Sequence, residues 1–261
     1  MIASLGDLRR AGRLHEENRR TADRIGLDSY IRWLQAEDVF HCHWEGRWDE
    51  ALAAAGDFIR DVETGYAHYM ESPCRFIRGA INLARGHPEL ALADARRGIE
   101  VARDAKDPQS LNPALAFGIR AELAVGDHET ASAIADELLA AWSEIGVGAP
   151  HESVDGAWAF RELGRGDQFE KALGQAAAQT LWHDAARQVV AGDLAGAADA
   201  YAEIGSMPDE TYARLKAAEE CVRTRDRAEA DRQLRVALPV LTKLRATAWL
   251  GEAEALLAAS A

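Results

Sequence analysis

The run Gly46-Arg47-Trp48-Asp49-Glu50-Ala51 decides the fold, because related runs recur at a fixed interval of 40 residues. The related runs are Gly6-Asp7-Leu8-Arg9-Arg10-Ala11, Gly86-His87-Pro88-Glu89-Leu90-Ala91, Gly126-Asp127-His128-Glu129-Thr130-Ala131 and, out of phase, Gly192-Asp193-Leu194-Ala195-Gly196-Ala197. Self-similarity at such a period is typical of stacked helical-repeat proteins. The sequence therefore predicts an all-α fold built from successive antiparallel helix pairs.

Each run predicts a tight turn between two helices. Glycine closes a helix in the left-handed conformation at little cost. The residue two positions later, such as Trp48 or His128, is expected to begin the next helix. Asp49 and Glu129 then fall in a first turn, where the helix dipole favours negative charge. The alanine five residues after each glycine is expected where two helices cross, since a small side chain lets them pack closely.

Amphipathic periodicity extends this pattern along the chain. Helices are expected near 7–25, 28–45, 48–64, 69–85, 88–105, 111–125, 128–144, 157–164, 168–190, 194–204, 208–223, 226–237 and 239–259. The glycines and proline of 144–157 predict a loop, and Pro239 predicts a break or a kink between the last two helices. We expect repeats of about 40 residues over 1–145 and repeats of shorter period over 157–261, in one continuous solenoid. The unequal periods favour an open stack over a closed toroid.

The recurring run resembles the tetratricopeptide repeat, whose second helix opens with a Gly-Asp-Tyr-Asp-Glu-Ala-like run. Gly46 to Ala51 is the nearest match, and Gly79 occupies the small-residue place of a first helix. Val39 and Ile119 depart from that pattern, and the 40-residue period is longer than the family norm. The resemblance implies an α-α superhelix, a right-handed stack of antiparallel helix pairs.

More narrowly, segments 46–58, 85–95 and 191–203 resemble the C-terminal repeat region of bacterial adenylate-cyclase-like and LuxR-type signalling ATPases. This resemblance implies a non-catalytic scaffold for protein–protein interaction in a bacterial signalling or transcription-regulatory system. A protein or peptide would be the partner, with an ATPase or cyclase module as one candidate. An alternative is a small-molecule sensor module of such a regulator.

Candidate binding residues follow from the first helix of each pair, which lines the concave groove in tetratricopeptide-like stacks. Trp33, Phe40 and Trp44 share one helical face, which is either core or groove wall. Aromatic side chains and arginines dominate binding energy at interfaces. The expected groove residues are Trp33, Glu37, Phe40, His43, Trp44, Phe76 and Arg120.

Catalytic and metal motifs are missing from the sequence. There is no phosphate-binding Gly-x-x-x-x-Gly-Lys loop, no His-Glu-x-x-His and no nucleophile elbow. The adjacent residues His41, Cys42 and His43 point about 100° apart on a helix, so they cannot close on one metal without distant partners such as His68 or Cys74. His183 next to Asp184 is expected to be a surface histidine. We therefore expect no enzyme activity, cofactor or metal, with an α/α-toroid enzyme as the remaining alternative.

Charge and composition restrict the partners. A net charge of −13 opposes binding to nucleic acid or to anionic membranes. Three scattered cysteines do not form a disulfide framework, and no signal peptide or membrane-spanning run is apparent. These features predict a cytoplasmic protein.

Overall fold

The computed structural model describes residues 3–148 and 150–260, which form fourteen α-helices and one short 3-10 helix, with no strand among them. The first half contains η1 (Ala3–Leu5), α1 (Leu8–Ile25), α2 (Asp28–Trp44), α3 (Trp48–Glu63), α4 (Glu71–Ala84), α5 (Pro88–Ala105), α6 (Pro108–Ala124) and α7 (His128–Ile145). The second half contains α8 (His151–Glu162), α9 (Gly166–Leu173), α10 (Leu181–Ala191), α11 (Leu194–Ile204), α12 (Met207–Thr224), α13 (Arg227–Leu244) and α14 (Thr247–Ser260). The all-α class is confirmed.

The recurring glycines close helices as predicted. Gly46 and Gly126 adopt φ angles of 72° and 81°, in the left-handed region. Helices α1, α3, α5, α7 and α11 each begin two residues after their glycine. Where an aspartate follows the glycine, its side chain caps the new helix, as Asp127 does by accepting from the Thr130 N–H at 3.0 Å. The turn positions therefore follow from local chemistry.

One expected loop is partly helical. Helix α8 begins at His151 and passes through Gly156, where the sequence predicted a loop until residue 157. A Cβ at Gly156 would lie 2.9 Å from the Phe169 ring and 3.0 Å from the Trp142 ring. Glycine is therefore present because neighbouring rings need the space, and not because the chain turns there.

Two other boundaries also differ from the sequence expectation. Pro239 lies inside α13, on its exposed side, where water can bond to the carbonyl group that proline leaves without a donor. The break comes later, at Arg245, which has a φ of 52°. The segment expected as one helix over 168–190 is two helices, α9 and α10.

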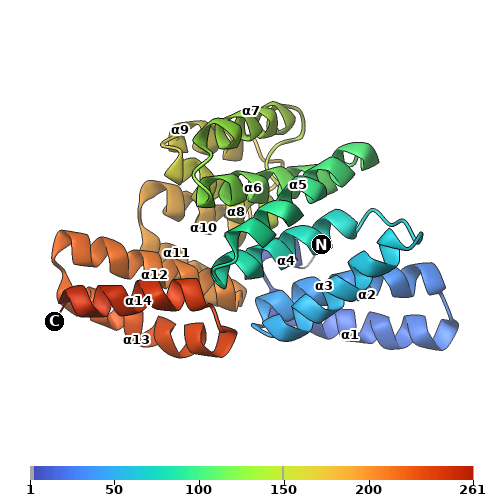
Figure 1. Ribbon diagram of the computed structural model, residues 1–261, viewed down its shortest axis with the longest axis horizontal. Coiled ribbons are helices and arrows are strands. Elements are labelled where there is room, and N and C mark those ends of the chain that lie inside the picture. Colours follow the sequence, from blue (N-terminus) through green and yellow to red (C-terminus); the bar gives the residue numbers. More distant parts are fainter. Residues whose placement is uncertain (1–2, 149, 261) are drawn as a thin grey trace.

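Alternate helices form an inner layer. Helix α4 contacts both α2 and α6, and α8 contacts both α6 and α10, while the odd-numbered helices cover their outer sides. Figure 1 shows the chain running from α1–α3 at one side, over α5–α9, to α13 and α14 at the other side. Packing continues from α6 to α8, across the segment between the two expected repeat regions.

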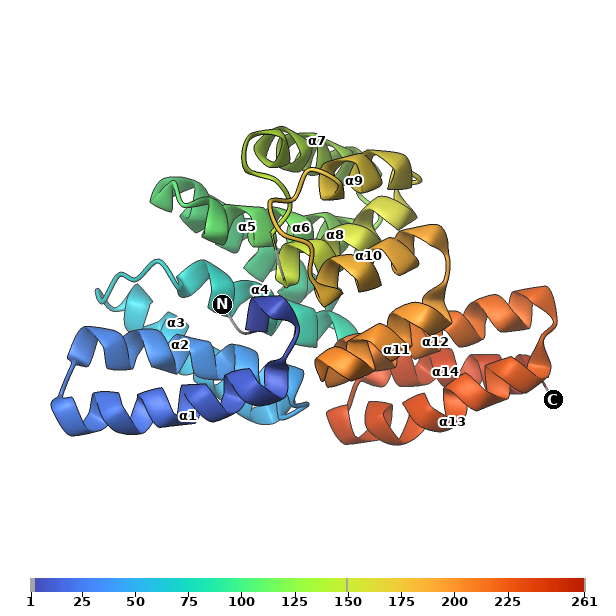
Figure 2. The same cartoon turned by 180° about the vertical axis from the view of Figure 1, so that it is seen from behind.

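The two ends of this arch meet, which differs from the open stack expected from the unequal periods. Helix α2 contacts α12, and α4 contacts α14. Thr247 donates a hydrogen bond to the Arg85 carbonyl at 2.7 Å, and Trp182 donates one to the Ala3 carbonyl at 2.7 Å. Figure 2 shows the N-terminal η1 near the centre, close to α10. Aromatic and aliphatic side chains fill much of the inner face.

Candidate functional site

Two neighbouring cavities lie among the inner helices. The outer cavity has a volume of about 490 Å³, and the inner cavity about 40 Å³. Trp44, Phe76 and His151 line both, so they form the partition between the two. Other residues around the outer cavity include Trp33, Glu37, Phe40, Tyr69, Met70, Pro73, Asp107, Gln109, Ser110, Pro113 and Glu152.

Aromatic rings build the wall that the two cavities share. The Phe40 ring lies 4.9 Å from that of His151 and 5.9 Å from those of Trp44 and Phe76, between centroids. The Trp44 and His151 rings stack at 5.2 Å with an interplanar angle of 5°. Trp33, nearer the surface, stacks on Tyr30 at 5.6 Å. The rings hold one another in place, so the wall is preformed.

Carboxylates are the charged groups of the outer cavity. Burial raises the pKa of Glu37. Asp107 caps α6 by accepting from the Gln109 N–H at 3.0 Å. Burial raises the pKa of Tyr69, and the charges of Glu37 and Asp107 raise it further, so this phenol stands near both carboxylates.

Glu152 is the most enclosed acid of the outer cavity, with 9% of its surface exposed. It accepts a hydrogen bond from Trp142 Nε1 at 2.8 Å. Burial raises its pKa to about 7, because a charged carboxylate is poorly solvated there. A Cβ at Gly148 would lie 1.8 Å from a Glu152 oxygen, so glycine at that position makes room for the carboxyl group.

The inner cavity is a polar pocket in an aromatic shell. Arg120 donates to Asp155 at 2.6 Å, and its guanidinium lies 5.2 Å from the centroid of the Tyr212 ring. Asp209 accepts from Ser206, and burial raises its pKa to about 7. The cavity has room for about three water molecules. It therefore stabilises buried polar groups and leaves no space for an organic ligand.

Two histidines near this pocket are neutral at neutral pH. Burial lowers the pKa of His43 to about 4. Burial, together with nearby His43, lowers the pKa of His151 to about 3. His43 Nδ1 and His151 Nε2 are enclosed and have no hydrogen-bond partner among the described residues.

All seven residues expected from the sequence line one cavity or the other. Trp33, Glu37, Phe40, Trp44 and Phe76 line the outer cavity, and His43 and Arg120 join Trp44 and Phe76 at the inner one. The stripe of Trp33, Phe40 and Trp44 is core and wall at once, because Phe40 and Trp44 are 7% and 5% exposed yet still face a cavity.

Sequence reasoning missed the contributions of α8 and α12. His151, Glu152 and Asp155 belong to the helix that was partly expected as a loop, and Asp209 lies about 50 residues further along. The one feature of the sequence that could have indicated these cavity residues was the acidic and histidine content of 151–155. It has no motif spacing, so only the fold reveals that these residues converge.

The adjacent His41, Cys42 and His43 diverge, as their helical spacing predicts. His41 packs against His15 with ring centroids 4.4 Å apart, whereas His43 stacks on Trp48 at 5.8 Å. In the described ranges, no three His, Cys, Asp or Glu side chains converge in the manner of a metal site.

The expectation for His183 was wrong. This residue is buried, and its ring forms a capping box with Thr180 while Nε2 contacts the Val147 carbonyl at 3.2 Å. Its side chain joins the start of α10 to the segment after α7. The adjacent pair His183-Asp184 in the sequence does not predict this contact.

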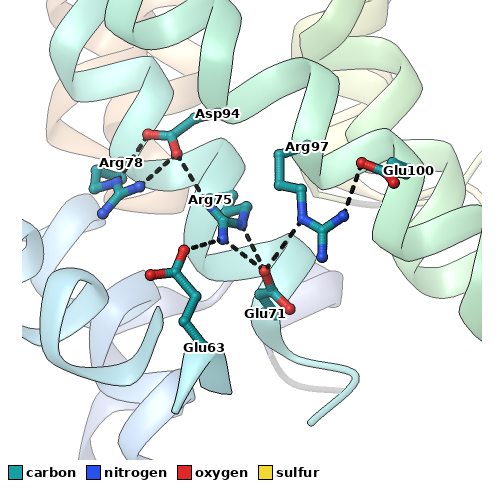
Figure 3. A network of polar contacts seen from close by, with 7 residues as sticks. All are labelled: Glu63, Glu71, Arg75, Arg78, Asp94, Arg97 and Glu100. Carbon is teal, nitrogen blue, oxygen red and sulfur yellow. Dashed lines mark hydrogen bonds and ion pairs between the residues drawn. The ribbon is translucent and has the colours of Figure 1, made fainter. Parts of the chain in front are cut away.

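A buried ion network holds the α4 wall of the outer cavity (Figure 3). Arg75 donates to Glu71 at 2.7 Å and to Glu63 at 2.8 Å, while Arg78 donates twice to Asp94. A buried charge is tolerated when it is paired and hydrogen-bonded. The network thus joins α3, α4 and α5, and we assign it a structural role.

Comparisons with known proteins identify no relative, so the proposal of a function depends on the geometry of the two cavities. No family model matches the chain, and no curated protein is significantly similar to it. Within the described residues, no helix is both long enough and apolar enough to cross a bilayer.

Proposed function

We propose that this protein is a non-catalytic ligand-sensing module whose outer cavity binds a small organic molecule. The observation that carries the proposal is the volume of about 490 Å³ within aromatic walls. Small-molecule sites in proteins occupy about 300–1,000 Å³ and are lined mostly by hydrophobic and aromatic side chains, with a few polar groups. The size and the lining of the outer cavity both fit this description.

A peptide-binding scaffold is less well supported. An extended peptide needs an open inner face, and the contacts of α2 with α12 and of α4 with α14 cover part of that face. Phe40, Trp44 and Phe76 are at most 7% exposed. These side chains can touch a small ligand at the end of a cavity, but they offer little surface to a passing chain.

An α/α-toroid enzyme would bring carboxylates together in a deep central cavity, as Asp155 and Asp209 do here. However, Asp155 is paired with Arg120 at 2.6 Å, and the inner cavity measures about 40 Å³. A pocket of that size holds a few water molecules and no substrate. These observations favour a polar core over a reaction centre.

The repeat pattern supports a regulatory setting for the sensor. We propose that a tetratricopeptide-like frame in the cytoplasm passes the binding signal to a protein partner, such as an ATPase or cyclase module. Affinity capture of a purified candidate module, with and without the ligand, tests this step. Equal capture in both conditions would contradict it.

Thermal unfolding against a metabolite library tests the central proposal. A ligand at about 100 times its Kd stabilises the folded protein by about 2.7 kcal/mol, which raises Tm by several degrees. Gln109→Trp places a large ring at the exposed mouth of the outer cavity and should abolish the shift. Gln35→Trp, on the exposed side of α2 and outside the cavity lining, is the matched control. Equal shifts in both variants would refute binding in the outer cavity.

A further inference from the structure

The charged side chains that line the outer cavity are all acidic. Glu37, Asp107 and Glu152 line it, and none of the described residues around it is lysine or arginine. A cavity with focused negative potential attracts cations and repels anions. Phosphorylated or carboxylated ligands are therefore poor candidates for this site.

The walls of the same cavity offer aromatic faces. Trp33, Phe40, Trp44, Tyr69 and Phe76 all line it. The negative face of an aromatic ring attracts organic cations, and rings combined with carboxylates recognise quaternary ammonium groups. A cation that leaves water for such a site exchanges its hydration for ring faces and for carboxylate charge.

A polar atom without a partner lies in the partition between the two cavities. His151 Nε2 is enclosed and has no hydrogen-bond partner within the described part of the chain, and His151 lines both cavities. Buried polar groups are normally hydrogen-bonded, so an exception requires an explanation. Water in the inner cavity, which His151 also lines, is the simplest partner for this nitrogen. The imidazole is neutral, so it does not oppose a cation.

We infer that the outer cavity binds an organic ammonium ion, with aromatic rings around the charged group and Glu37 and Asp107 nearby. This inference rests on the proposed function, because it names the ligand class of the same cavity. Glu152 adds negative charge on the α8 side when it is ionised.

Three probes of similar size but different charge test the preference. They are choline (positive), 3,3-dimethylbutan-1-ol (neutral) and 3,3-dimethylbutanoate (negative), titrated while tryptophan fluorescence and heat of binding are recorded. We expect the Kd for choline to be at least about tenfold lower than that for the neutral alcohol, with no measurable binding of the anion. Equal affinity for choline and the alcohol, or preference for the anion, would overturn the inference.

Single substitutions then locate the source of the preference. Glu37→Gln and Asp107→Asn keep shape and hydrogen-bond acceptors but remove charge, so each should weaken choline binding several-fold and leave the alcohol unchanged. Glu89→Gln, an exposed acid outside the cavity lining, should change neither. Trp33→Phe should retain binding that Trp33→Leu loses, because only the former keeps an aromatic face.

The results separate this inference from the broader proposal. If another compound stabilises the protein and Gln109→Trp blocks it, while choline does not bind, the cation inference fails and the sensing module stands. If no compound binds, both fail. A melting curve for each variant that matches the wild-type curve shows that a lost binding signal does not come from unfolding.

Discussion

At the scale of single residues, burial changes chemistry most clearly at Glu152. Its pKa rises from an ordinary 4.5 to about 7 because the residue is buried, with only 9% of its surface exposed. The folded chain therefore holds this proton more tightly than the unfolded chain does. The carboxyl group contributes stability that is fully present below about pH 4.5 and is lost as the pH rises through about 7.

This linkage predicts the behaviour of Glu152→Gln. Glutamine keeps the acceptor for Trp142 Nε1 and cannot ionise. Between about pH 5 and pH 8, the free energy of unfolding of the wild type should fall relative to that of the variant by about 2–3 kcal/mol. Urea unfolding at several pH values measures the difference, in which contributions from other titrating groups cancel. Parallel curves would show that Glu152 is solvated.

At the scale of elements, helix starts depend on the residue that follows the turn glycine. Asp127 accepts from the Thr130 N–H and from its hydroxyl group, at 3.0 and 2.8 Å. His87 occupies the equivalent position before α5 and makes no side-chain cap. The same turn is thus capped in one repeat and uncapped in another.

We expect opposite effects from two substitutions at these positions. Asp127→Ala should lower the free energy of unfolding by about 1 kcal/mol, because backbone donors lose their acceptor. His87→Asp should raise it by about 0.5–1 kcal/mol, because the new carboxylate caps α5 and meets the positive end of its dipole. Chemical denaturation measures both. A lower free energy of unfolding for His87→Asp would show that the backbone at position 87 cannot hold a helix cap.

At the scale of the whole molecule, the meeting of the two ends closes the inner cavity, which Asp209 of α12 and Trp249 of α14 help to line. Asp49 pairs with Arg85 at 2.8 Å and with Arg245 at 3.0 Å, and the Trp48 and Trp249 rings lie 5.8 Å apart. These contacts join α3 and the end of α4 to the last two helices. They thereby hold the inner cavity closed, whereas the residues that line the outer cavity lie between Ala3 and Glu152.

Two glycines in equivalent turns test this closure. A Cβ at Gly46 would lie 2.5 Å from Met207 Sδ and 2.9 Å from a Leu244 methyl, whereas nothing lies within 4 Å of a Cβ at Gly126. Both have positive φ, so alanine is strained equally at either position. Gly46→Ala should therefore cost about 1 kcal/mol more stability than Gly126→Ala. Equal losses in urea unfolding would mean that the ends do not meet.

The amino-acid sequence was enough to predict the helical class, the turns at the recurring glycines and the faces that look inward. Glycine conformation, aspartate caps and the 3.6-residue period act within a few residues, so their effects are legible in the chain. Trp33, Phe40 and Arg120 were found because they share those inward faces.

Only the tertiary structure decided that the inner faces enclose cavities. Closure of the inner cavity depends on pairs such as Trp48 and Trp249. These residues are about 200 positions apart in the sequence, and no local rule connects them. Gly156 illustrates the same point, since the rings of Trp142 and Phe169 explain it and its neighbours in sequence do not. The outer cavity depends likewise on residues far apart in the sequence, such as Phe40 and His151, whose rings lie 4.9 Å apart in its wall.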